Sequence, residues 1–156
     1  MQLIERDVPP RVVWALEQAG VHPLLARLFA ARGVRQADEL DDSPARLLPP
    51  DALLGTREAA VLLADAIAAG QRICIVADYD CDGATACATA LRGLRMLGAR
   101  PEQLGYVVPD RALHGYGLTP PIVEMVKARR ADVLVTVDNG MASHEAVDLA
   151  HTLGMK

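Results

Sequence analysis

The chain has 156 residues, of which 51% are hydrophobic, so it is long enough to bury one core. Its formal charge is −4, from 16 Lys plus Arg against 20 Asp plus Glu, which excludes the strong basic excess of a self-sufficient nucleic-acid-binding domain. Three cysteines without C-x-x-C spacing, and no apolar run approaching ~18 residues, argue against a disulfide framework, a structural zinc site and a membrane span, and favour the reducing cytoplasm.

Residues 1–55 are expected to form a helical leader. Apolar residues from Leu24 to Ala31 recur at helical spacing, and the segment is interrupted at Gly33, Pro44, Pro49 and Pro50. A longer helix is expected to follow, with Thr56 as its N-cap and Gly70 as its C-terminal stop. Neither segment contains residues that indicate chemistry.

Beyond Gly70 the chain alternates apolar, β-branched runs with helical segments. The apolar runs predict strands at 73–77, 105–108 and 133–137. Helices are predicted at 84–97, from Thr119 to residue 130, and from residue 144 to 153 with Ser143 as cap. This order is typical of an α/β fold, in which helices flank a parallel sheet and the crossovers are right-handed.

Four aspartates follow two of the predicted strands. Asp78, Asp80 and Asp82 lie at alternate positions after the first strand, and Asp138 follows the third. The carboxyl ends of parallel strands form the crevice where ligands bind, so these side chains are expected to converge. Close like charges repel unless a cation neutralises them, and all-oxygen ligation favours Mg²⁺ or Mn²⁺. The sequence therefore predicts a metal site at this edge.

Other interpretations of the segment DYDCDG stay open. Asp and Gly turn the chain and cap helices in strand-to-helix loops, and one aspartate alone is explained by that role. An EF-hand loop also begins D-x-D-x-D-G, but Thr89 stands where it needs a bidentate glutamate, and a strand precedes the segment. An aspartyl-phosphate phosphatase would use the first aspartate as nucleophile and the second as general acid, but the charge of Asp82 suits metal ligation better.

The segment 108–118, VPDRALHGYGL, contains three candidates for substrate binding. Arg111 offers a planar fork for a phosphate, Tyr116 offers a ring for stacking, and His114 offers a further phosphate contact. Structural roles compete with each, because loop arginines are often solvated and a single histidine is rarely catalytic, so Arg111 is the strongest candidate. Cys81 is expected to be a packed thiol, since an extended loop turns it away from the neighbouring aspartates.

Three stretches, VADYDCDGATA, VPDRALHGYGL and LVTVDNGMASHEA, occur in this order, and HPLLARLFAARGV lies in the leader. In order and spacing they resemble the first motif, the arginine and Gly-Tyr-Gly loop, the second motif and the N-terminal region of RecJ-type exonucleases, within the DHH phosphoesterase superfamily. The resemblance covers nearly the whole chain. Its departures are mild: Asp110 stands where the family more often has asparagine, and Cys81 where it has alanine or valine.

The resemblance implies a two-metal site holding Mn²⁺ or Mg²⁺, and stepwise removal of nucleotides from the 5′ end of single-stranded DNA during repair and recombination. It implies that Asp80, Asp82 and Asp138 are metal ligands, that Asp138 bridges the two ions, and that Asp78 is a further ligand or a partner of the ligands. It also implies that Arg111 positions the substrate and that a single-strand-binding protein is a partner.

The chain ends before the Asp-His-His motif that the resemblance leads us to expect. Residues 56–156 are therefore expected to form an incomplete, truncated DHH phosphoesterase domain that is inactive by itself. Two alternatives stay open: another DHH phosphoesterase that acts on oligoribonucleotides, cyclic dinucleotides or pyrophosphate, or a noncatalytic module that binds metal or nucleic acid.

Overall fold

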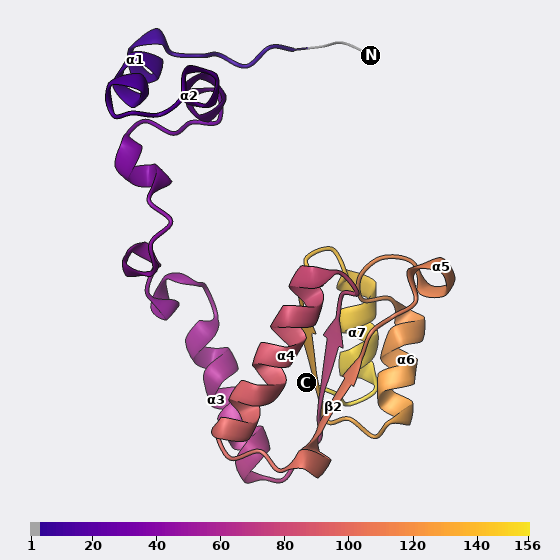
Figure 1. Ribbon diagram of the computed structural model, residues 1–156. Helices are drawn as coiled ribbons and strands as arrows, with labels where there is room; N and C mark the ends of the chain where they lie inside the picture. The colour runs from indigo at the N-terminus through magenta and orange to yellow at the C-terminus, as the bar shows by residue number, and fades with distance from the viewer. Residues whose placement is uncertain (1–3) are drawn as a thin grey trace. The chain divides into compact units, whose positions relative to one another are not determined.

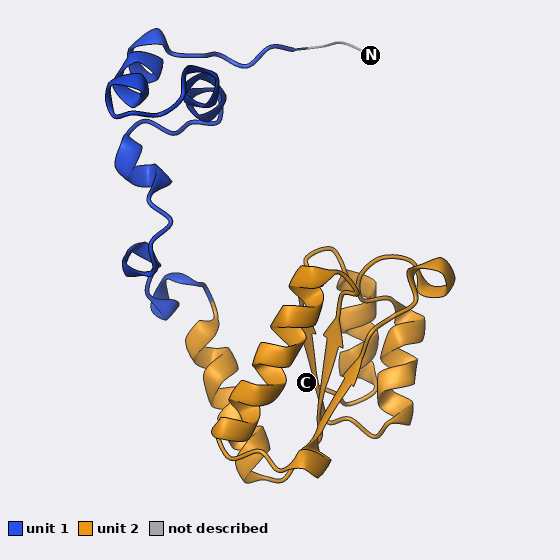
Figure 2. Ribbon diagram, in the orientation of Figure 1, with its two compact units in different colours: residues 1–54 blue, residues 55–156 orange. Residues whose placement is uncertain are grey.

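The computed structural model describes residues 4–156 and divides the chain into two compact units, one ending at Leu54 and one beginning at Gly55 (Figure 2). Unit 1 contains α1 (Pro10–Gln18) and α2 (Pro23–Ala30), which pack on each other. Both helices begin with a proline, at a position where no backbone N–H is needed. Short 3₁₀ turns follow at Ala37–Leu40, Pro44–Arg46 and Pro50–Ala52. A helical N-terminal region is therefore present, as expected, although residues 1–3 of the predicted leader lie outside the described residues.

Unit 2 opens with α3 (Thr56–Ala68). Gly55 occupies the N-cap position with a φ of +79°, a left-handed conformation that glycine adopts at little cost, so Thr56 is the first helical residue and not the predicted cap. The helix ends ahead of Gly70, which is also left-handed at φ +71°. This turn leads the chain into the sheet.

The sheet of unit 2 has three parallel strands in the order β2-β1-β3. The strands are β1 (Ile73–Ala77), β2 (Leu104–Val107) and β3 (Val133–Val137), with Ile73 of β1 in register with Leu104 and Val133. Every residue of β1 is buried, as its unbroken apolar sequence predicts for a central strand covered on both faces.

Helices cover the two faces of the sheet in separate layers (Figure 1). On one face, Ile73 and Ile75 pack with residues of α3 and of α4 (Cys81–Met96). On the other, Cys74 and Val76 pack with residues of α6 (Pro120–Ala128) and α7 (His144–Thr152). The predicted α/β fold is therefore confirmed. No described helix is long and apolar enough to cross a membrane.

The strand order creates a switch point beside β1. The chain leaves β1 through α4 to reach β2 on one side, and leaves β2 through α6 to reach β3 on the other side. Both connections are expected to be right-handed, and because they run in opposite directions along the sheet, their helices lie on opposite faces. The switch point is the gap between the carboxyl ends of β1 and β3, where the direction of the connections reverses. Ligands bind at such points in open α/β sheets.

Helix α4 begins three residues earlier than predicted. Asp80 is its N-cap, and the Asp80 carboxylate accepts a hydrogen bond of 3.2 Å from the Gly83 amide. The loop after β1 is therefore short, and Asp82 lies in the first helical turn. Cys81, expected to be packed, is instead exposed because it is helical and not extended. The other two cysteines, Cys74 and Cys87, are buried.

Candidate metal centre

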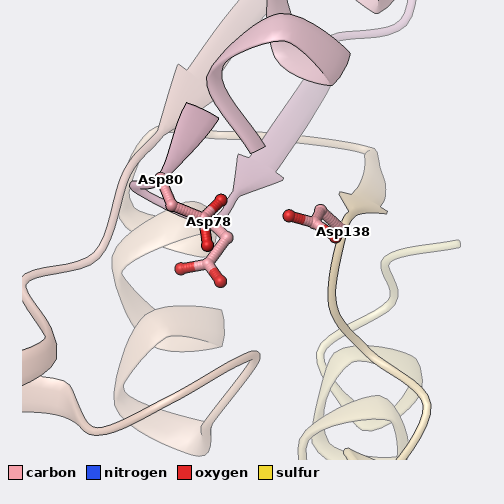
Figure 3. A group of neighbouring side chains, drawn as sticks. All are labelled: Asp78, Asp80 and Asp138. Carbon is pink, nitrogen blue, oxygen red and sulfur yellow. The ribbon is translucent and has the colours of Figure 1, made fainter. Parts of the chain in front are cut away.

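Three aspartates meet at the carboxyl edge of the sheet, between β1 and β3 (Figure 3). Asp78 is the first residue after β1, Asp80 caps α4, and Asp138 is the first residue after β3. Each offers a carboxylate oxygen, and these oxygens lie within 4.8 Å of one another. Aspartates that are 58 to 60 residues apart in the sequence thus come together at the switch point, as the sequence predicted.

The fourth aspartate, Asp82, is not in this group. It is exposed on the first turn of α4, where the helical backbone replaces the extended loop assumed from its alternate spacing. Its charge nevertheless acts on Asp138, as described below. Asp82 therefore lies near the acidic group and adds to the negative electrostatic potential at Asp138.

The backbone after β3 is shaped to present Asp138. Asp138 has a φ of +59°, in the left-handed region that aspartate tolerates better than most residues. The side-chain amide of Asn139 donates hydrogen bonds to the carbonyl oxygens of Val76, at 3.2 Å, and Val137, at 2.9 Å. Asn139 therefore joins the ends of β1 and β3. It was not singled out from sequence, although an amide directly after a strand-end aspartate is a usable signal.

Gly83 is a second residue that sequence reasoning missed. A Cβ atom at this position would lie 2.3 Å from the Asp78 carbonyl oxygen and 2.6 Å from the Asp78 carbonyl carbon. The first turn of α4 can therefore pack on the strand end only because residue 83 has no side chain. The final glycine of DYDCDG is the signal, and its role is close approach and not turn formation.

The carboxyl groups of the centre have opposite pKa shifts. Loss of solvation raises the pKa of Asp138, and the charges of Asp80 and Asp82 raise it further. The pKa of Asp78 is lowered, chiefly by the hydrogen bonds that the Arg111 side chain donates to it. Repulsion is thus relieved at Asp78 but not at Asp138. An all-oxygen group with uncompensated negative charge fits a divalent cation such as Mg²⁺ or Mn²⁺.

Arg111 lies directly against the acidic group. It is the first residue of α5 (Arg111–His114), a single turn where a loop was predicted, capped by a 2.8 Å hydrogen bond from the Ala112 amide to the Asp110 side chain. Its Nε donates to Asp78 Oδ1 at 3.2 Å, and its Nη2 donates to Asp78 Oδ2. The same Nη2 lies 3.7 Å from Asp80 Oδ2.

The other two substrate-binding candidates lie differently. The Tyr116 hydroxyl is 3.5 Å from the Asp138 carbonyl oxygen, and Tyr116 and Asp138 both line a cleft of about 690 Å³ that continues along the loop before α7. His114 Nδ1 contacts the Asp110 carbonyl oxygen at 3.2 Å, within its own helical turn. The structure therefore brings Arg111 and Tyr116 to the aspartates, whereas the described contact of His114 is local.

Replacing Arg111 with leucine is expected to destabilise the chain in a pH-dependent way. Because the pKa of Asp78 is lowered on folding, its pairing with Arg111 contributes stability that is present above the ordinary aspartate pKa of about 3.9 and is lost as the pH falls through the lowered value. The difference in unfolding free energy between wild type and Arg111→Leu, measured by urea denaturation, should shrink over that range. A constant difference would mean that Arg111 stabilises the fold only by packing.

The doubly wound parallel sheet with carboxylates at its switch point defines an α/β protein with a candidate site for a hard divalent cation. The family described as DHH family, N-terminal domain, matches residues 72–156. The chain belongs to this family.

Two kinds of relatives agree with this assignment. The chain is 47% identical over 137 residues to the single-stranded-DNA-specific exonuclease RecJ of Salmonella typhimurium, a match that covers 88% of this chain and 23% of that protein. A crystal structure of exonuclease RecJ bound to manganese is similar with a TM-score of 0.62 and 37% identity, covering 72% of this chain and 28% of the other. A crystal structure of RecJ of Thermus thermophilus in complex with Mn²⁺ is similar with a TM-score of 0.59 and 31% identity. This match covers 98% of this chain and 21% of the other. The chain thus spans about a quarter of the length of these proteins.

Proposed function

We propose that this chain supplies part of a two-metal-dependent exonuclease that removes nucleotides from the 5′ end of single-stranded DNA. One observation carries the proposal: carboxylates from the ends of two strands converge at the switch point within 4.8 Å. The fold by itself assigns no substrate. The substrate is proposed because relatives that match most of this chain are named as single-stranded-DNA-specific exonucleases.

In this proposal Asp80, Asp82 and Asp138 would hold the metal, and Asp78 would be a further ligand or a partner of the ligands. Two such ions, when bound, supply an activated water and stabilise charge on the phosphate. The raised pKa of Asp138 supports its assignment, because a site that disfavours the bare carboxylate favours a neutralising cation. Asp82 is exposed on the first turn of α4, and its charge helps to raise the pKa of Asp138, which supports its place beside the group.

Arg111 is the proposed contact to the substrate phosphate, because it lies beside the carboxylates and carries a planar set of donors. Tyr116 is the proposed stacking surface, since this residue is 65% exposed and lines the cleft beside Asp138. His114 is retained as a weaker phosphate contact. These roles require only residues that line the carboxyl edge of the sheet.

The cellular setting is proposed in the same way. Residues 1–55 act as a helical leader and residues 56–156 as an incomplete DHH domain, in a protein of DNA repair and recombination that works with single-stranded DNA and a single-strand-binding protein. The cytoplasm is the proposed compartment, and the three free cysteines suit its reducing conditions.

A chimera tests the function. In it, this chain replaces the matching segment of the Salmonella RecJ protein, and digestion of end-labelled single-stranded and duplex DNA is followed with Mn²⁺ or Mg²⁺ present. We expect the chimera to shorten single strands from the 5′ end and the isolated chain to be inactive. Asp80→Asn should lower the chimera's rate more than about 100-fold, because loss of groups that merely support metal ligands already costs 10–100-fold.

The control is Asp65→Asn, which alters an exposed aspartate on α3. A chimera that stays active after Asp80→Asn and Asp138→Asn would refute the proposed metal centre. Hydrolysis of dinucleotides without digestion of longer strands would favour another DHH phosphoesterase. Digestion by the isolated chain would refute its expected inactivity.

A further inference from the structure

The guanidinium of Arg111 lies close to two tyrosine rings. Its Cζ atom is 4.3 Å from the centroid of Tyr79 and 4.8 Å from that of Tyr116. Tyr79 comes from the loop after β1 and Tyr116 from the loop after α5, so the two rings reach the arginine from separate segments. Both tyrosines are more than half exposed, at 57% and 65%. Both distances are within the range of cation–π contacts.

One edge of the same guanidinium is held by Asp78. Both carboxylate oxygens of this buried residue accept hydrogen bonds from Arg111, and Oδ1 accepts another of 2.8 Å from the Tyr79 amide. Nη1 of Arg111 makes no described hydrogen bond among residues 4–156. Two rings lie close to the guanidinium, and Asp78 accepts hydrogen bonds from its Nε and Nη2 atoms, so Nη1 is the nitrogen available to a further acceptor.

We propose that Tyr79 and Tyr116 are positioning residues that, with Asp78 as anchor, hold Arg111 so that its Nη1 edge binds a phosphate group beside the acidic centre. An arginine fixed in this way loses less side-chain entropy on binding than a free one, and its planar fork matches phosphate oxygens. We call Tyr79, Tyr116 and Asp78 together the clamp. Because Asp78 partly offsets the charge of Arg111, the clamp contributes mainly by orienting the guanidinium. The phosphate assignment rests on the proposed function, whereas the clamp does not.

The clamp is tested by NMR on the ¹⁵N-labelled, metal-free chain, through the Nε–H resonance of Arg111, which Arg111→Lys removes and so assigns. We expect this proton to exchange slowly and to be shifted by the ring currents. Tyr79→Leu, Tyr116→Leu and Asp78→Asn should each remove the protection, whereas Tyr79→Phe and Tyr116→Phe should keep it, because the ring and not the hydroxyl makes the contact. Tyr106→Leu is the matched control, since Tyr106 is also exposed but lies on β2.

The phosphate site is tested by titrating inorganic phosphate while following the same resonance. We expect a saturable shift at Arg111, and a dissociation constant raised about 2- to 5-fold by Tyr79→Leu or Tyr116→Leu, as expected for the loss of one exposed cation–π contact. A protected resonance in both leucine variants would overturn the clamp, and no phosphate-dependent shift at Arg111 would overturn the binding role. Failure of the proposed nuclease would appear separately, in the chimera.

Discussion

Replacing Asp80 or Asp138 with asparagine should weaken Mn²⁺ binding by this chain at least about tenfold, because each substitution removes one charged ligand from a group of three. The two residues follow different strands, so loss of affinity in both variants requires that the strand ends share a site. Isothermal titration calorimetry with Mn²⁺ measures the effect. Because the pKa of Asp138 is raised, Mn²⁺ binding should also weaken as the pH falls through this raised pKa, since protons then compete with the cation for the carboxylate.

Asp65→Asn is the matched control for this experiment, and circular dichroism should show that all variants are folded. Binding that weakens in only one variant would contradict a shared site. No binding by the unsubstituted chain would mean that further ligands are needed to assemble the site, or that the aspartates serve only as turn formers and caps. The hydrogen bond from Gly83 to Asp80 shows that capping is one of the roles.

Gly83→Ala should destabilise the chain by about 3 kcal/mol, at the upper end of the usual cost of overpacking. The added Cβ would lie under 3.0 Å from three backbone atoms of Asp78, and neither the strand end nor the helix backbone can yield as a flexible side chain does. Separating α4 from β1 would also move Asp80 away from Asp78. Urea denaturation should therefore show a lower free energy of unfolding, together with weaker Mn²⁺ binding.

Gly93→Ala is the matched control because it lies on the same helix and a Cβ there meets nothing within 4 Å. Alanine at that position should stabilise the chain by about 0.5–1 kcal/mol, since glycine is the poorer helix former. If the two substitutions changed stability alike, the close approach of Gly83 to Asp78 would have no energetic consequence.

The sequence predicted β1 and β3 at their observed bounds because an unbroken apolar run followed by an aspartate is typical of a buried parallel strand. β2 begins and ends one residue earlier than predicted. The sequence also predicted that Asp138 would meet Asp78 and Asp80, since parallel strands share a carboxyl edge. The start of α4 was wrong because aspartate suits both an extended loop and a helix cap, and only the cap bond to Gly83 decides between them.

The contacts around Arg111 could not be predicted in the same way. Its pairing with Asp78 joins residues 33 positions apart, and the single turn of α5 that directs it is shorter than periodicity can detect. Tyr79 was overlooked because one exposed aromatic residue has no pattern. Such features depend on how loops fold over the sheet, which is set by tertiary packing and not by local propensity.

The side-chain amide of Asn139 holds the ends of β1 and β3 at a fixed distance from each other. Neighbouring strands of a sheet are about 4.8 Å apart, a repeat set by backbone hydrogen bonds and the same for every sequence. The side-chain amide of Asn139 joins the two strand ends that Asp78 and Asp138 follow, and the carboxylate oxygens of these residues and of Asp80 lie within 4.8 Å of one another. The separation of the backbone positions that carry Asp78 and Asp138 is thus set by the sheet, so sequence drift in the surrounding loops can alter what approaches the group without moving these two strand ends apart.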